Sequence, residues 1–403
     1  MSVYNKIKPQ STPEKEMSDP KNFQRNHGLN RTSIKWDFFN PDVLPAWVAE
    51  MDFPLAAPIK EKISKILDAS DTGYPSLKLE EELRTVFFER MQTQFNWTPS
   101  DLPLVYFQDA VQGIFHLVDC FTQENDKLVT LTPIYPPFLE VGEKLNRRCV
   151  EIALRNIDGV DSIDWDALRT AAKGARMLLL CNPHNPTGRV FSKNELDTLA
   201  QIVLENNLIV IADEIHADLV YPPHTHIPFA TISPDINAQT LTLTSATKTF
   251  NLGGLRCAIL AFGDPAMQQR FALRPWQIRG GLNIMGMHAT ISAWRHGHDW
   301  LKETMKTLEH NRNTLLESLE NMLPEMICNQ PQATYLAWLD CRNLHLGDDP
   351  AAHFLKHGRL GLSSGPLFGK AGAGFARLNF ATSPNILSEV LERLTQSVKN
   401  TRG

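Results

Sequence analysis

Apolar residues along this chain recur in two alternating patterns. The first is a short run of consecutive apolar residues, as in Met177 to Cys181 and Leu208 to Ala212. The second is a longer segment with apolar residues three or four positions apart, as in 57–70 and Leu77 to Phe95. Continuous apolar runs predict strands that are buried on both faces, and the wider spacing predicts amphipathic helices.

The two patterns alternate between residues 104 and 244, which predicts an α/β fold with a mostly parallel sheet covered on both faces. Ligands of such sheets bind beyond the carboxyl ends of the strands. The predicted elements are strands at 104–108, 127–131, 149–154, 177–181, 208–212 and 240–244, and helices at 111–121, 136–144, 165–172 and 193–206.

The pattern changes after residue 285, where a second and smaller α+β unit is expected. It comprises two long helical segments over 289–323, strands at 335–339 and 376–380 on either side of a glycine-rich loop, and a closing helix at 384–398. The glycine-rich loop lacks the strand–GxGxxG–helix order of dinucleotide sites, so NAD is not expected. We therefore predict a large domain at 57–285 and a small domain at 286–403.

The N-terminal segment 1–56 is predicted to contribute to the small domain and to the entrance of the site. Residues 1 to about 30 are polar and are expected to form a loose arm. Prolines 41, 45, 54 and 58 indicate a constrained loop in the following stretch and disfavour a helix interior there.

Composition excludes several classes of function. The 403 residues are 42% hydrophobic with a net charge of −5, so no basic surface for nucleic acid is expected. No apolar run reaches the ~18 residues of a membrane span, and the polar first 21 residues predict no secretory signal. The six cysteines are scattered and predict free thiols of a cytoplasmic protein. No HExxH motif or Cys/His cluster indicates a metal site.

Three candidate chemical residues follow predicted strands. Asn185 lies after the strand 177–181, Asp213 follows 208–212, and Lys248 follows 240–244. Parallel strands end at the same edge of a sheet, so these side chains are expected to converge on one cleft. A lysine in a packed site usually has a charge partner or a covalent role, and a Schiff base with pyridoxal phosphate (PLP) is such a role. The simpler alternative is a surface lysine in a Ser/Thr-rich loop.

Longer motifs carry a family resemblance that spans nearly the whole chain. The chain resembles the fold type I PLP enzymes (aminotransferase class I/II) and, more narrowly, the MalY/PatB-type cystathionine β-lyases. The resemblance implies a PLP enzyme acting on a small amino acid, a homodimer with shared active sites, and β-elimination. Its motifs are SIKWD (33–37), LPAWVAEMDF (44–53), GYP (73–75), NPHNPTGRVFS (182–192), DEIHADLV (213–220), HIPFA (226–230), TKTFNLGGL (247–255), TYLAWLDCR (334–342) and RLNFA (377–381).

The resemblance implies roles for the residues that follow the strands. Lys248 would hold PLP and then act as acid and base at Cα. Asp213 would keep the pyridine nitrogen protonated, so that the ring accepts electrons from Cα. Asn185 would contact the 3′-oxygen of the ring. His216 stands where aminotransferases usually have tyrosine, and the β-lyase branch typically has histidine there.

The cofactor phosphate would bind at the start of the helix after the strand 104–108, because free amide groups at a helix start bind anions. Gln112, where an apolar residue is usual, could reach phosphate or substrate. The implied phosphate contacts are Ala110, Val111, Gln112, Ser245, Arg256 and, across the dimer, Tyr74 and Asn283.

Substrate contacts are implied mainly by Arg377, which would clamp the α-carboxylate with two hydrogen bonds. An arginine inside an apolar strand is costly to bury unless an anion meets it, which supports this role. Tyr135 matches the aromatic residue that stacks on the cofactor ring. Trp47 and Asn185 complete the candidate substrate contacts.

The predicted reaction is cleavage of a β-thioether or β-thiol L-amino acid into thiol, pyruvate and ammonia. An aminotransferase would use the same groups, and Arg256 favours it. Departures from the family pattern at Ala110, Gln112, Thr247, Ala333 and 363–365 would suit a specialised elimination or cyclisation enzyme. A non-enzymatic scaffold is disfavoured because the candidate catalytic residues are intact.

Overall fold

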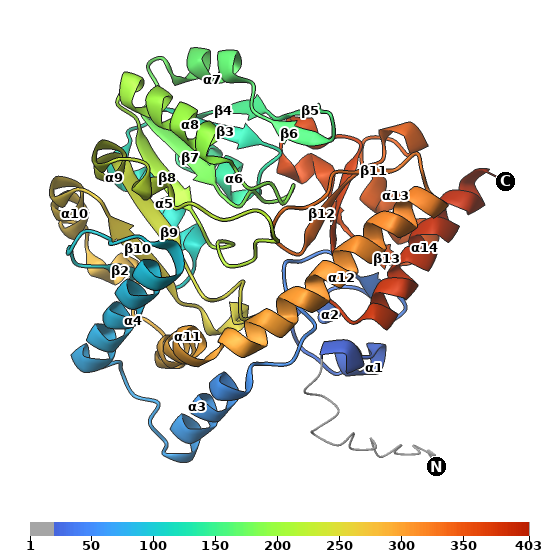
Figure 1. Cartoon of the computed structure of the whole chain (residues 1–403), viewed down its shortest axis with the longest axis horizontal. Coiled ribbons are helices and arrows are strands. Elements are labelled where there is room, and N and C mark those ends of the chain that lie inside the picture. Colours follow the sequence, from blue (N-terminus) through green and yellow to red (C-terminus); the bar gives the residue numbers. More distant parts are fainter. Residues whose placement is uncertain (1–19, 403) are drawn as a thin grey trace.

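A seven-stranded sheet forms the centre of the computed structural model, which describes residues 20–402 (Figure 1). The strand order is β2-β10-β9-β8-β7-β3-β4, and β10 is antiparallel to both of its neighbours. The other pairings are parallel, which confirms the predicted α/β class. The strands are β2 (Val105–Phe107), β3 (Lys127–Thr132), β4 (Arg148–Ala153), β7 (Met177–Cys181), β8 (Ile209–Asp213), β9 (Thr240–Thr244) and β10 (Ala258–Phe262).

Helices cover both faces of this sheet. Alternate strand residues point to opposite faces, so Leu179 and Ile211 pack with one layer of helices while Leu178 and Val210 pack with the other. The first layer comprises α5 (Ala110–Phe121), α6 (Pro137–Lys144) and α10 (Pro265–Ala272). The second comprises α7 (Trp165–Ala172), α8 (Lys193–Asn206) and α9 (Pro234–Gln239).

Three further helices pack beside β10 and form a third apolar cluster. Their ends follow from local capping. Ser76 accepts a hydrogen bond from the amide of Leu79 at the start of α4, and Asn96 ends that helix in the left-handed conformation. The helices are α3 (Ala57–Asp68), α4 (Leu77–Phe95) and α11 (Ile284–His296).

The C-terminal part forms a second sheet, which is antiparallel and has the strand order β11-β12-β15-β14. Its core is continuous with Leu44, Met51 and Phe53 of the N-terminal segment. The elements are β11 (Ile327–Cys328), β12 (Leu336–Asp340), β14 (Ser363–Ser364), β15 (Phe375–Asn379), α12 (His298–Met322), α13 (Pro350–Gly358) and α14 (Pro384–Arg402).

The N-terminal segment is more ordered than its sequence predicts. The expected loose arm is wrong for residues 20–30, because α1 (Arg25–Leu29) forms and Phe23 is buried in the C-terminal core; residues 1–19 lie outside the described part. A second short helix, α2 (Ile34–Asp37), precedes the constrained loop. Strand β1 (Leu44–Pro45) then pairs with β13 (Leu360–Gly361), which places this segment beside the C-terminal helices (Figure 1).

A buried ion pair holds this segment in place. Lys35 Nζ lies 2.8 Å from Asp52 Oδ2, and these side chains are 1% and 0% exposed. The indole N–H of Trp36 donates to Asp52 Oδ1 at 2.7 Å, and Lys35 also donates to the carbonyl oxygen of Glu50. The SIKWD motif therefore fixes the chain that leads to residues 47–50.

We expect Asp52→Asn to lower the free energy of unfolding by about 3–5 kcal/mol, because it leaves the ammonium of Lys35 buried without a counter-charge. Chemical denaturation measures this loss. The control is Asp42→Asn, which breaks an ion pair with Arg359 whose side chains are about half exposed, and it should cost about 0–1 kcal/mol. Equal losses in the two variants would contradict the structural role of Asp52.

Candidate active site

Three neighbouring parallel strands bring the predicted chemical residues together. Strands β7, β8 and β9 are adjacent, and Cys181 at the end of β7 is paired in register with Asp213 at the end of β8. The loops that follow carry Asn185 and Lys248. All four residues line one cavity of about 220 Å³ beyond the strand ends. Sequence-distant groups therefore converge where ligands of parallel sheets bind.

The second sheet contributes Arg377 from β15, a buried cation in this cavity. Its Nη1 donates to Asn185 Oδ1 at 2.9 Å, and its Nη2 donates to the carbonyl oxygen of Trp47 at 2.9 Å and to Ser363 Oγ at 3.2 Å. Its Nε is buried without a hydrogen-bond partner. None of these partners is an anion, and no carboxylate among the described residues forms an ion pair with Arg377. The site therefore has a strong attraction for an anionic ligand.

Lys248 and Asp213 have strongly perturbed pKa values. Burial is the main cause in both cases; it lowers the pKa of Lys248 to about 8, helped by Arg377, and raises the pKa of Asp213 to about 7. The Nζ of Lys248 donates to the carbonyl oxygen of Ala49 at 2.9 Å, and Asp213 Oδ1 accepts from the amide of Ile215 at 3.1 Å. Such perturbed groups in one cavity are typical of a catalytic centre.

Two other cavity residues are uncharged near neutral pH. Burial, with Lys248 and Arg377 nearby, lowers the pKa of His216 to about 3, and its Nδ1 is buried without a hydrogen-bond partner. Burial raises the pKa of Tyr135, so its phenol keeps its proton. Both side chains line the cavity as polar, neutral groups.

One end of the cavity is formed by the start of α5. Ala110 and Val111 line it, and the amide groups of a first helical turn have no partners within the helix. Arg256 lies at the same end and forms an ion pair with Asp109, which is also the N-cap of α5. An anionic group would bind at this end, because a helix start and a guanidinium group both attract negative charge.

Several predicted cofactor contacts lie outside the cavity lining. The side chain of Gln112 accepts from the amide of Gln108 and donates to the carbonyl oxygen of Arg279. The hydroxyl of Ser245 donates to the carbonyl oxygen of Cys257 at 2.6 Å. Both side chains therefore hold the backbone around the cavity.

The single chain also places three other predicted side chains away from the cavity, those of Tyr74, Asn283 and Trp47. Tyr74 is fully exposed between α3 and α4. Asn283 caps α11 and donates to the carbonyl oxygen of Leu255. The indole of Trp47 packs against Phe38, and it is the carbonyl group of Trp47 that contacts Arg377.

Sequence reasoning missed three groups at the site. Asp109 pairs with Arg256, the carbonyl group of Ala49 contacts Lys248, and the hydroxyl of Ser363 contacts Arg377. The signal for Asp109 was its position before a predicted helix, where aspartate is a preferred N-cap. The contacts of Ala49 and Ser363 depend on the packing of distant segments.

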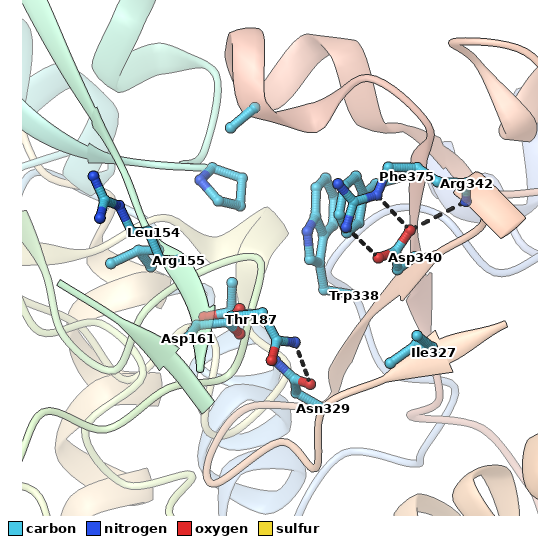
Figure 2. A pocket seen from close by; sticks show the side chains of 13 residues that line it. Leu154, Arg155, Asp161, Thr187, Ile327, Asn329, Trp338, Asp340, Arg342 and Phe375 are labelled. Atoms are coloured by element: carbon cyan, nitrogen blue, oxygen red, sulfur yellow. Dashed lines mark hydrogen bonds and ion pairs between the residues drawn. The ribbon is translucent and has the colours of Figure 1, made fainter. Parts of the chain in front are cut away.

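A second cavity of about 320 Å³ lies between the hairpin of β5 (Arg155–Ile157) and β6 (Val160–Ser162) and the second sheet (Figure 2). Both of its arginines are already paired with carboxylates, and burial raises the pKa of its Asp161. Arg342 binds both carboxylate oxygens of Asp340, at 2.9 and 2.6 Å, and Arg155 pairs with Asp164. The first cavity, with its uncompensated buried cation, is therefore the candidate active site.

Comparisons with known proteins agree with this geometry. PatB, a cystathionine beta-lyase of Bacillus subtilis, is 32% identical over 380 residues, which cover 92% of this chain and 98% of PatB. The crystal structure of cystalysin from Treponema denticola, which contains pyridoxal 5′-phosphate, has a TM-score of 0.89 and 29% identity and covers 96% of this chain and 99% of cystalysin. The crystal structure of OvoB has a TM-score of 0.87 and 33% identity, with coverage of 94% and 98%.

The family model for aminotransferase class I and II matches residues 49–394. The chain therefore belongs to the aminotransferase class I and II family, and the predicted family is confirmed. Among the described residues, no helix combines the length and the apolar composition needed to cross a bilayer. All six cysteines are free, and four of them are buried.

We expect Asp213→Asn to stabilise the cofactor-free protein. Asp213 titrates near pH 7 in the folded state but near ~3.9 when unfolded. The unfolded chain therefore releases this proton first, and the contribution of Asp213 to stability falls as the pH rises from about 4 to about 7. At pH 8 the asparagine variant should be more stable, on the order of 2 kcal/mol, and this gain should shrink towards pH 4.

Denaturation of the cofactor-free protein at several pH values measures this difference. The control is Asp197→Asn, whose exposed carboxylate pairs with Lys193 on α8. The stability of this control variant relative to the wild type should not increase between pH 4 and pH 7. A stability loss at pH 8 for Asp213→Asn would contradict the burial argument.

Proposed function

We propose that the protein is a PLP-dependent carbon–sulfur β-lyase that cleaves a cystathionine-like L-amino acid into a thiol, pyruvate and ammonia. The observation that carries this proposal is the cavity in which Lys248, Asp213 and Arg377 meet, and none of the three forms an ion pair within the described part of the chain. The relatives named as cystathionine beta-lyases support the same reaction. The family resemblance also implies a histidine at the position of His216 in the β-lyase branch.

The residues present fit PLP. Asp213 is a buried carboxylate that a protonated pyridine nitrogen would neutralise, and Lys248 offers an amine for covalent attachment beside it. Asn185 would donate to the 3′-oxygen of the ring. The start of α5 and Arg256 would hold the phosphate group. When bound, PLP supplies an electron sink for the pair of electrons left on Cα.

Arg377 would bind the α-carboxylate of the substrate. In the part of the chain that the structure describes, its buried guanidinium has only neutral hydrogen-bond partners. A carboxylate that displaces the carbonyl group of Trp47 or the hydroxyl of Ser363 therefore gains a charge-assisted contact. Tyr135 forms a wall of the same cavity and would pack against the cofactor ring. These contacts orient Cα towards Lys248.

Lys248 would then move the proton from Cα. Burial and Arg377 lower its pKa to about 8, so a useful fraction of the amine is neutral near physiological pH. Its Nζ takes the proton from Cα, the Cβ–S bond breaks, and the sulfur leaves as a thiolate that acquires a proton. The released 2-aminoacrylate reacts with water to form pyruvate and ammonia.

We also propose that the active form is a homodimer in the cytoplasm. Tyr74 is fully exposed in the single chain although it is a large aromatic residue, which supports a contact with a second copy. In that dimer Tyr74 and Asn283 would approach the phosphate of the neighbouring site. Six free thiols support a reducing compartment.

The domain division remains a proposal as well, with a large domain at 57–285 and a small domain at 286–403. The shared core of the N-terminal segment and the C-terminal sheet supports the assignment of 1–56 to the small domain and the site entrance, as far as residues 20–56 are described.

Purified protein should bind PLP and release pyruvate from cystathionine without a keto-acid co-substrate. We expect Lys248→Ala to lose covalent PLP and to lower the rate by roughly 100- to 10,000-fold, because it removes the acid–base group at Cα. Absorbance spectra and a coupled pyruvate assay measure the two effects. Conversion of the cofactor to its pyridoxamine form by amino acid alone, without pyruvate, would instead identify an aminotransferase.

Arg377→Lys should lower kcat/KM by roughly 10- to 100-fold, mainly through KM, because a lysine cannot make the two-point contact with a carboxylate. The matched control is Arg342→Lys, since Arg342 is paired with Asp340 outside the candidate active site. Steady-state kinetics of the two variants test the assignment. An unchanged KM for Arg377→Lys would remove Arg377 from the substrate site.

A further inference from the structure

A buried polar network lies next to Lys248 but outside the cavity. Arg90 on α4 forms an ion pair with Asp218, and these side chains are only 4% and 8% exposed. The second carboxylate oxygen of Asp218 accepts a hydrogen bond from Thr249 Oγ1 at 3.0 Å. Thr249 is fully buried and directly follows Lys248. The network therefore ends one residue away from the proposed covalent site.

This network joins two of the loops that form the site. Asp218 and His216 belong to the segment after β8, and Asp213 is the last residue of β8. Thr249 belongs to the loop after β9, which carries Lys248. The hydrogen bond between Asp218 and Thr249 therefore ties the loop of the lysine to the loop of the carboxylate.

The other end of the network is anchored in the helices beside β10. The guanidinium of Arg90 lies 5.5 Å from the ring centroid of Trp294 on α11, and both residues are buried. A buried ion pair is a weak source of stability, because the cost of removing two charges from water offsets their attraction. Its value here is geometric, since it holds the carboxylate of Asp218 in one orientation towards Thr249.

We propose that Asp218, held by Arg90, is a positioning residue for Lys248 that acts through the hydroxyl of Thr249. This inference rests on the proposed function, in which the amine of Lys248 must be attached to the cofactor and later reach the proton on Cα. The side chain has to swing between these positions while its backbone stays in place. The bond from Thr249 to Asp218 keeps that backbone fixed.

The test replaces Thr249 with valine, which has nearly the same shape but no hydroxyl and leaves the pair of Arg90 and Asp218 intact. Thr249→Ser restores the hydroxyl without the methyl group. The matched control is Thr395→Val on α14, which removes another buried hydroxyl bond, from Thr395 Oγ1 to the carbonyl oxygen of Leu391, in the C-terminal helix.

For Thr249→Val we expect kcat to fall about tenfold or more with KM little changed, because small misplacements of a catalytic group are costly. The midpoint of the pH-dependent change in the absorbance of bound PLP should shift, because this midpoint depends on the position of Lys248. Thr249→Ser should recover both properties. Thr395→Val should lower the melting temperature and leave kcat and the absorbance midpoint unchanged.

Equal behaviour of Thr249→Val and Thr395→Val, with a loss of stability alone, would overturn the inference. Failure of Thr249→Ser to recover kcat and the absorbance midpoint would also overturn it. The wild type separates this result from a failure of the proposed function. A wild type that binds no PLP or forms no pyruvate refutes the function, whereas an active wild type with an unimpaired Thr249→Val refutes only the positioning role.

Discussion

The site depends on the hydrogen bonds that the backbone carbonyl groups of residues 47–50 accept. Arg377 and Lys248 donate to the carbonyl oxygens of Trp47 and Ala49, and Asn379 donates to those of Val48 and Glu50 at 2.7 Å each. Each of these carbonyl groups accepts a further hydrogen bond, from Ser363, Glu50, Tyr335 or Lys35, so the short segment is held from several sides. The same hydrogen bonds therefore hold the segment, the strand β15 and the lysine loop against one another.

This arrangement explains why the two sheets act as one site. The parallel sheet supplies a lysine, a carboxylate and an amide at its strand ends, and the antiparallel sheet supplies a guanidinium opposite them. Their charges are buried but not mutually neutralised, because their hydrogen-bond partners among residues 20–402 are neutral groups. Such an arrangement destabilises the empty protein and favours ligands that bring the missing opposite charges.

Much of the fold was predictable because its signals are local. Helices α7 and α8 have the bounds that the apolar spacing predicts, and their starts are marked by the N-caps Asp164 and Ser192. Strand β7 was equally clear as a continuous apolar run, and β9 has the predicted bounds. Strand β10 was not predicted, and its antiparallel direction and the order of the N-terminal segment were missed. Both depend on contacts with residues far away in the sequence, such as the burial of Phe23 in the C-terminal core.

The sequence by itself determined the α/β class, the family and the three strand ends that carry Asn185, Asp213 and Lys248. It could do so because hydrophobic periodicity and the order of the motifs can be read directly from the amino-acid sequence. Only the tertiary structure decided that Gln112 and Ser245 hold backbone, that Trp47 offers its carbonyl group, and that Arg377 has no anionic partner among the described residues. Those outcomes depend on which buried polar groups meet, and packing between distant segments selects them.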